Sequence, residues 1–362
     1  MTSKRCMLFV QSLLVACLSL LIVVPATAQE ESNKEVNVKE IVFDHIFDSY
    51  EWHVTEWGGH PVAVPLPVIV KGEKSGWHLF LSSKLHKGHE YQGFYIASEG
   101  DYKGKIVEKN DQNVAVRPLD ISITKNTFSL LLASFVLVLI MLSVTQFYKK
   151  NTFKKAPGGF VGMVEVIILT IYEDVVIKCV GKDYKRYAPY LLTVFFFVLL
   201  NNLMGLIPFF PGGANVTGNI AITLVLSICT FIAINVFGTK EYWKEILWPE
   251  VPVWMKVPIP MMPVLELVGI FTKPFALTIR LMANIMAGHA AVLGLTSLVF
   301  VTVRMGPAIN ASMTIGSVLF CIFMSFIELL VAFIQAYVFT MLSAVFIGLS
   351  RVEPHHKENT IE

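Results

Sequence analysis

Charged side chains are scarce in this sequence: Asp, Glu, Lys and Arg make up 15% of its 362 residues, whereas 54% are hydrophobic. The mean hydropathy is +0.62. Such a composition excludes an ordinary soluble domain and indicates a polytopic membrane protein. The net charge is only +2 and the basic residues form no patch, so the sequence also argues against a nucleic-acid partner.

Cysteine is scarce as well, which excludes a disulfide framework outside the membrane. Residues 29–125 contain none, and Cys179, Cys229 and Cys321 lie in or beside apolar segments without metal-ligand spacing. We expect no metal site and no cofactor. Six of the nine histidines do fall in residues 29–125, but they form no compact ligand motif, and we interpret them as solvated surface side chains: His45, His53, His60, His78, His86 and His89.

The start of the chain has the three parts of an export signal. Lys4 and Arg5 form a short basic region, an apolar run covers residues 7–24, and the small-x-small pattern ATA follows. We expect a signal peptide over residues 1–28, cleaved after its last alanine. An uncleaved first membrane helix is the alternative. A lipoprotein cleavage box ending at Cys17 is a weaker one, because the apolar run continues past that residue.

Residues 29–125 are polar and mixed, and three apolar stretches in them predict short strands: AVPLPVIV, GWHLFLSS and YQGFYIAS. We expect a small β-rich exported domain here. Residues 126–148 then carry no charge and match the length of one membrane span. Four lysines follow this span. Because positive residues stay in the cytoplasm, the span should run inward and leave residues 29–125 outside.

The middle of the chain predicts one surface helix and two further spans. Residues 158–180 are apolar but interrupted by charges, which indicates an amphipathic helix on the cytoplasmic surface. No residue between Arg186 and Lys240 is charged. We expect two spans there, over about 188–207 and 219–237, joined by a turn outside the membrane.

From Met262 to Ser350 the chain forms two apolar stretches, each longer than one span. A helix of some 35–40 residues is roughly 50–60 Å long, whereas the hydrocarbon core is about 30 Å thick. We expect a long tilted antiparallel hairpin with its turn near Pro307. The predicted fold class is an all-α polytopic membrane domain over residues 126–352, with about five membrane helices, followed by a cytoplasmic tail over residues 353–362.

Polar residues inside this predicted hairpin fall into two pairs. Arg280 and Asn284 share one helix face because they are four apart, and Glu328 and Gln335 share a face because they are seven apart. One antiparallel register brings Arg280 level with Gln335 and His289 level with Glu328. His289 points about 180° away from Arg280 around its helix. The Arg280–Gln335 pair and the His289–Glu328 pair should therefore line different surfaces of the hairpin.

Asparagine and glutamine in membrane helices often serve only to hydrogen-bond one helix to another. This structural role is the alternative for Asn284 or Gln335 when each is considered alone. Arg280 differs because arginine stays charged at any working pH. No acidic residue falls on its level, so we expect a partner from another chain. His289 and Glu328 are ionisable groups that can pass a proton.

Three further residues of the hairpin have weaker signals. Glu266 and Lys273 share one face near the cytoplasmic end and could form a solvated edge or act directly. Gly288 could serve only to let two helices pack closely. The sequence leaves a solvated edge and a direct role equally open for Glu266 and Lys273, and a packing role and a functional role equally open for Gly288.

Three stretches resemble the a subunit of the membrane sector of bacterial F-type ATP synthases: FTKPFALTIRLMANIMAGH, NNLMGLIP and FIELLVAFIQAYVFTMLSAVFIGL. The resemblance covers roughly residues 126–352. It implies that Arg280 faces the carboxylate on each c subunit of the rotor ring. His289 and Glu328 occupy positions that carry glutamate and histidine in the opposite order in some members. Gly205 stands where some members have an acidic residue.

The resemblance implies a non-catalytic stator subunit that offers two offset proton half-channels to the c-ring and couples proton flow to ATP synthesis on other subunits. Its partners would be the c-ring, the b-subunit peripheral stalk, other synthase subunits and the lipid bilayer. It would lie in the bacterial inner membrane, with the N-terminal domain periplasmic and the C-terminus cytoplasmic. The residues implied in proton translocation are Arg280, Asn284, His289, Glu328 and Gln335, with supporting roles for Glu266, Lys273, Gly288 and Asn202.

Two other functions are consistent with a membrane protein of this kind. A secondary transporter would use Arg280 to bind an anionic substrate, and inverted repeats would favour it, but we find no repeat. A non-conducting scaffold with an exported sensor domain would tolerate replacement of Arg280 and Glu328. The sequence leaves open the choice between proton and sodium, which rests mostly on the rotor subunit, and the role of residues 29–125.

Overall fold

The structure is a computed structural model. It describes residues 48–57, 60–72, 76–97, 100, 102–109, 115–151, 157–207, 210, 212–247 and 261–351. The predicted signal peptide, residues 1–28, and the predicted cytoplasmic tail, residues 353–362, lie outside the described residues.

The N-terminal region is built from short antiparallel strands, as the alternating apolar stretches predicted. Strands β1 (Glu51–Trp57) and β2 (His60–Pro65) form a hairpin. A second sheet has the order β4-β3-β8, and a third has the order β5-β6-β7. Their bounds are β3 Pro67–Gly72, β4 Gly76–Leu81, β5 Phe94–Ile96, β6 Ile106–Lys109, β7 Ala115–Val116 and β8 Leu119–Asp120, with a 3-10 helix η1 over Ser82–Gly88.

One face of the β4-β3-β8 sheet forms a small core. Val68 and Val70 alternate along β3 and are fully buried, as the two-residue period of a strand requires. They pack in a cluster with Phe80 and Phe94. The Tyr50 hydroxyl donates a hydrogen bond to Asp120 beside this core, and burial together with this carboxylate raises the pKa of Tyr50.

The helical part begins with α3 (Lys125–Asn151), whose apolar side chains include the exposed Phe135 and Leu142. Next comes an amphipathic segment that buries Val175 and Val176 and exposes Glu173 and Asp174. Its middle is a π-helix, η2, which the sequence did not indicate. The elements of this part are α4 Gly159–Thr170, η2 Ile171–Ile177, α5 Lys178–Val180, η3 Gly181–Asp183, α6 Tyr184–Leu206, α7 Ile220–Asn235 and α8 Lys240–Leu247.

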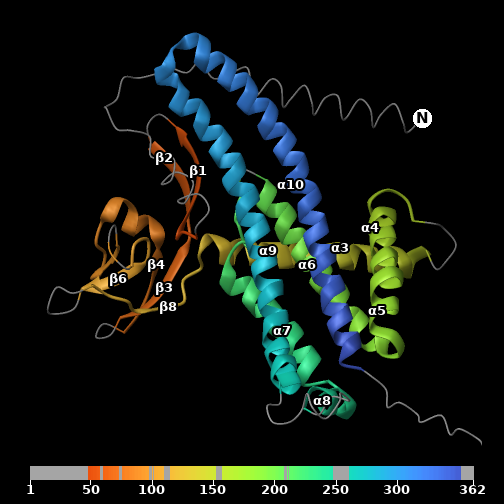
Figure 1. Ribbon diagram of the computed structural model, residues 1–362. Coiled ribbons are helices and arrows are strands. Elements are labelled where there is room, and N and C mark those ends of the chain that lie inside the picture. Colours follow the sequence, from red (N-terminus) through yellow and green to blue (C-terminus); the bar gives the residue numbers. More distant parts are fainter. Residues whose placement is uncertain are drawn as a thin grey trace, which may run out of the picture. The chain divides into compact units, whose positions relative to one another are not determined.

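The chain ends in two very long helices, α9 (Met261–Thr302) and α10 (Pro307–Leu349). They lie side by side and run in opposite directions (Figure 1). A 3-10 turn η5 (Val303–Met305) and Gly306, at φ +108, reverse the chain between them. The predicted antiparallel hairpin with its turn near Pro307 is therefore confirmed. Its tilt in a bilayer stays a prediction.

Three of the described helices are long and apolar enough to cross a membrane: residues 125–150, 264–302 and 307–349. The first matches the span predicted at 126–148. Helices α6 and α7 coincide with the spans predicted at 188–207 and 219–237, but α7 has only 16 residues. The predicted total of about five membrane helices is thus supported for three.

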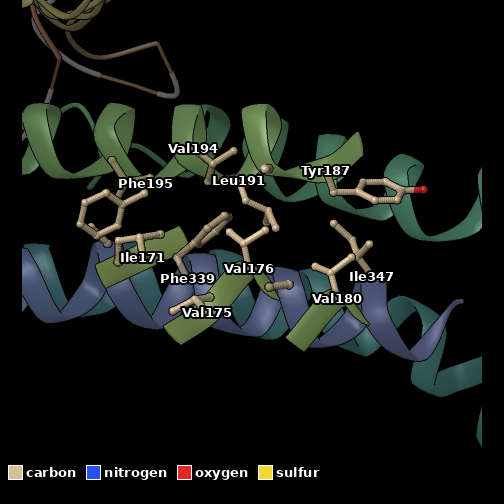
Figure 2. Close-up of a cluster of buried hydrophobic side chains, with 14 of the residues drawn as sticks. Ile171, Val175, Val176, Val180, Tyr187, Leu191, Val194, Phe195, Phe339 and Ile347 are labelled. Atoms are coloured by element: carbon tan, nitrogen blue, oxygen red, sulfur yellow. The ribbon is translucent and has the colours of Figure 1, made fainter. Parts of the chain in front are cut away.

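The core of the helical part lies where α6, η2 and α10 meet. Side chains from these elements point toward one another in Figure 2, with Leu191 and Phe195 from α6, Val175 from η2, and Phe339 and Ile347 from α10. Small residues on α10 let the helices approach closely. Ala332, Ala336 and Ala344 are fully buried, and Gly348 packs directly on the carbonyl of Cys179. Such small-residue contacts are the usual means of joining helices in lipid.

Gly348→Ala should destabilise this core, because the added methyl group would overlap the Cys179 carbonyl. We expect a loss of about 1–3 kcal/mol, the usual cost of overpacking, measured as a lower thermal unfolding temperature of the purified subunit. Gly316→Ala on the same helix meets nothing within 4 Å and is the matched control. Equal unfolding temperatures for the two variants would contradict this packing.

Candidate functional site

His289 and Glu328 form a buried contact between the two hairpin helices. Nδ1 of His289 lies 2.5 Å from Oε1 of Glu328, and their side chains are 19% and 9% exposed. The register that placed these two residues on one level is confirmed. Apart from this ion-pair contact, Glu328 Oε1 has no hydrogen-bond partner among the described residues. An imidazole and a carboxylate in direct contact can pass a proton from one to the other.

Gly288 makes room for this pair. A Cβ atom at position 288 would lie 3.0 Å from Glu328 Oε1 and 3.3 Å from its carboxyl carbon. Any larger side chain would push the carboxylate away from His289. The structure thus favours a close-approach role for Gly288 beside the pair, where the sequence left packing and function equally open.

Besides α9 and α10, helix α6 also contributes to the site. Asn202 is 2% exposed, and its Nδ2 donates to the carbonyl of Ala332 on α10 at 3.0 Å. Its Oδ1 accepts a 2.7 Å hydrogen bond from Thr217 Oγ1. One turn of helix separates Ala332 from Glu328. Asn202 therefore ties α6 to the part of α10 that carries the carboxylate.

Gly205 lies on the same side of the site. A Cβ atom there would lie 3.7 Å from His289 Nε2 and 3.4 Å from the carbonyl oxygen of Ala214. The position that carries an acidic residue in some members of the resembled family thus borders the ring of His289. Because both distances are ordinary van der Waals contacts, a side chain could fit there.

The segment between α6 and α7, residues 207–219, supplies two groups that the sequence did not identify: the Ala214 carbonyl and the Thr217 hydroxyl. The Ala214 carbonyl borders Gly205, which also borders His289, and the Thr217 hydroxyl donates to Asn202, which is bonded to α10. The sequence marked this segment only as a turn. Its uncharged polar residues, Asn215, Thr217 and Asn219, were the available signal.

Arg280 and Asn284 lie on a different surface of α9. Both are exposed, whereas Leu277, Leu281 and Ile285 on the neighbouring face of the helix are buried. Within the described part of the chain, no hydrogen bond, ion pair or ring contact reaches Arg280. The prediction that the arginine and the His289–Glu328 pair occupy different surfaces is confirmed.

Gln335 does not join Arg280 on this surface. It is 7% exposed, so it faces the interior of the helical part. No described contact links it to Arg280. The two residues are close in level along the hairpin, as the register requires, but only the arginine is exposed.

Glu266 and Lys273 lie at the opposite end of α9 from the hairpin turn. Glu266 is exposed, and burial together with its carboxylate raises the pKa of Tyr242 on α8. Lys273 is half-buried, with Nζ 5.5 Å from the ring centroid of Phe346. Neither side chain reaches the His289–Glu328 pair. Among the described residues no group of three or more His, Cys, Asp or Glu gathers as metal ligands would.

Comparison with known proteins identifies two matching families. The family described as "ATP synthase A chain" matches residues 129–348. The one described as "Domain of unknown function (DUF8433)" matches residues 41–121. Similar curated proteins are named ATP synthase subunit a. That of Chloroherpeton thalassium is 39% identical over 67% of this chain and 71% of its own, and that of Pelodictyon phaeoclathratiforme is 43% identical over 67% and 69%. The Myxococcus xanthus protein is 40% identical over 67% of this chain and 77% of its own.

Gly288→Ala should slow proton conduction by the reconstituted membrane complex several-fold, because the new methyl group displaces Glu328 from His289. Gly294→Ala on the same helix is the matched control, since its Cβ would meet nothing within 4 Å. Both changes raise helix propensity equally. Passive proton flux into vesicles checks this, and equal flux in the two variants would show that the spacing at Gly288 is unimportant.

Exchanging the pair should preserve its function better than changing either residue. His289→Glu alone places two carboxylates together, and Glu328→His alone places two imidazoles together, whereas the double variant restores one of each. We expect a favourable coupling of about 0.5–3 kcal/mol between the two changes, read from proton flux in a double-mutant cycle. Additive losses would mean that the two side chains act independently.

Proposed function

The chain belongs to the ATP synthase A chain family, and on that premise we propose that it is the stator subunit of the membrane sector of an F-type ATP synthase. It provides two proton half-channels to the rotating c-ring. Proton flow through them turns the ring and drives ATP synthesis on other subunits. The chain itself is non-catalytic. Besides the c-ring, its partners are the b-subunit peripheral stalk and the other synthase subunits.

The observation that carries this proposal is the exposed Arg280 in the middle of a helix suited to spanning a membrane. A guanidinium facing lipid at this depth costs at least a few kcal/mol on insertion scales. No described residue of the chain compensates it. An anionic partner supplied by another chain removes this cost, and a carboxylate on a rotor helix is such a partner.

The surface around Arg280 suits a helical partner. The exposed residues one to two turns away on the same face have small side chains: Ala276, Ala283, Asn284 and Ala287. Small residues let a second helix approach closely in lipid. A rotor helix packed here would bring its carboxylate within reach of the arginine, and Asn284 could bond to the same group.

The inlet half-channel uses the His289–Glu328 pair. A proton from outside passes along the polar groups of Thr217 and Asn202 to this pair and then to a rotor carboxylate. Gln335, one to two turns along α10 from Glu328, lines the later part of the path. Once neutral, the carboxylate can turn into lipid without the desolvation cost of a charge.

The outlet half-channel lies on the cytoplasmic side. After nearly a full turn of the ring, the carboxylate meets Arg280, which favours its ionised form, so that the proton leaves. Glu266 and Lys273 line this exit near the cytoplasmic end of α9. Arg280 also blocks a direct leak between the channels. Each proton that crosses 100 mV supplies about 2.3 kcal/mol.

The proposed topology follows from the charges that flank the helices. Lys149 and Lys150 end α3, and this positive charge supports a cytoplasmic location for that end and an outside location for the start of α3. The proposed domains are a signal peptide over residues 1–28, an exported domain over 29–125, a membrane domain with about five helices over 126–352, and a cytoplasmic tail over 353–362. The location is a bacterial inner membrane, with a proton as the transported ion.

A secondary transporter with Arg280 as an anion-binding residue is not supported. The similar curated proteins named above are ATP synthase subunits. The exposed position of Arg280 also differs from that of a substrate ligand, which would lie in an enclosed site.

Arg280→Ala should abolish ATP-driven proton pumping in inverted membrane vesicles without loss of assembled complex, because the rotor carboxylate loses the cation that favours its ionised form. Arg186→Ala, which removes an exposed arginine at the start of α6, is the matched control and should pump normally. The amount of complex is measured in the same vesicles. Normal pumping by Arg280→Ala would refute the proposed function.

A further inference from the structure

We propose that Trp52 of the exported domain is a positioning residue for the proton inlet. It braces residues 212–219, the segment that borders the His289–Glu328 pair. This inference rests on the proposed function, since it assigns to the exported domain a part in proton uptake from outside.

Trp52 is the centre of a small cluster that joins β1 to the segment between α6 and α7. It is 3% exposed and packs with Ala214 and Val216, which are 0% and 1% exposed. Its ring meets Phe210 edge-on at 5.3 Å between centroids, and Phe128 of α3 at 5.8 Å. Edge-on aromatic contacts of this kind add to the burial of the rings. Trp52 is thus the largest of the buried side chains that cover Ala214 and Val216.

Two hydrogen bonds connect the residues just before β1 to the start of α3. The backbone N–H of Asn126 donates to Asp48 Oδ1 at 3.0 Å, and the N–H of Lys125 donates to the Ser49 carbonyl at 2.9 Å. These bonds satisfy donors that a helix start otherwise leaves unpaired. Trp52 follows only three residues later, so the membrane helix itself holds the tryptophan in place.

The segment that Trp52 braces, residues 212–219, also contacts the groups of the proposed inlet. The Ala214 carbonyl borders Gly205 together with His289 Nε2, and Thr217 donates to Asn202. The N–H of Gly213 also donates to the carbonyl of Met204 at 3.1 Å, which folds the segment back on α6. Trp52 and the polar inlet groups thus contact the same short segment of the chain.

Loss of the indole would leave Ala214 and Val216 uncovered, and the segment could then shift into the space. The Thr217–Asn202 bond and the Ala214 carbonyl would move relative to His289. Proton uptake from outside would become slower, whereas proton release at Arg280, which lies on another surface of α9, would not change. The expected defect therefore depends on the pH of the inlet side.

The test uses the complete complex in liposomes, with ATP synthesis measured while the inlet-side pH is varied at a constant total driving force. Trp52→Ala should lower the rate several-fold at neutral inlet pH and require a more acidic inlet for half-maximal rate. Trp52→Phe, which keeps an aromatic ring, should restore most of the rate. Trp77→Ala in the same domain is the matched control, because this tryptophan is 58% exposed and lies outside the cluster.

A second variant keeps the test decisive if Trp52→Ala does not assemble. Thr217→Val removes the link to Asn202 from within the braced segment without touching the aromatic cluster, and it should produce the same shift toward an acidic inlet. An unchanged inlet pH dependence in Thr217→Val, or in an assembled Trp52→Ala complex, would overturn the inference. Failure of the proposed function would look different, as an Arg280→Ala complex that still makes ATP.

Discussion

The structure depends on one electrostatic constraint: a guanidinium cannot be left alone in lipid. Arg280 lies in the middle of a long apolar helix, on its exposed face, and no described group of the chain pairs with it. The positive charge of Arg280 thus has no counter-charge from the described part of the chain on this surface. In the proposed function a moving carboxylate on a rotor supplies the missing charge, which would link the position of one side chain to the coupling of proton flow and rotation.

The other polar groups of the hairpin are kept away from that surface by helix geometry. His289 lies half a turn away from Arg280 around α9, where it meets Glu328 of α10 in a buried contact. Gly288 gives this contact its space, and Asn202 fixes α6 against α10 beside it. One pair of helices can therefore present an imidazole–carboxylate pair on one side and an isolated cation on the other.

Much of this arrangement could be predicted from the sequence because it follows from the helical period and from the register of two antiparallel helices. The helical period placed Arg280 with Asn284, and the antiparallel register placed His289 against Glu328. The exposure of Arg280 opposite the buried Gln335 could not be predicted, because it depends on how the hairpin packs on α6 and α7. Thr217 was missed for a similar reason, since its role comes from a hydrogen bond to a residue 15 positions away.

The sequence predicted that the N-terminal region is rich in β-strands, but it did not predict how this region contacts the helices. No pattern in the sequence distinguishes the buried Trp52 from the exposed Trp77 in the same region. Only its contacts with Ala214, Val216 and Phe210 support the role proposed for it at the inlet. Contacts between distant segments such as these are set by tertiary packing and leave no periodic signal.

The most direct test of the central claim is the distance between the Arg280 guanidinium and the nearest rotor carboxylate in a structure of the assembled complex. The account predicts a rotor helix packed on the face formed by Ala276, Arg280, Ala283 and Ala287. The carboxylate should lie within about 4 Å of the guanidinium, the limit of an ion pair, or be bridged to it by one water molecule. A rotor packed on another face of α9, with Arg280 turned toward lipid or another stator subunit, would contradict it.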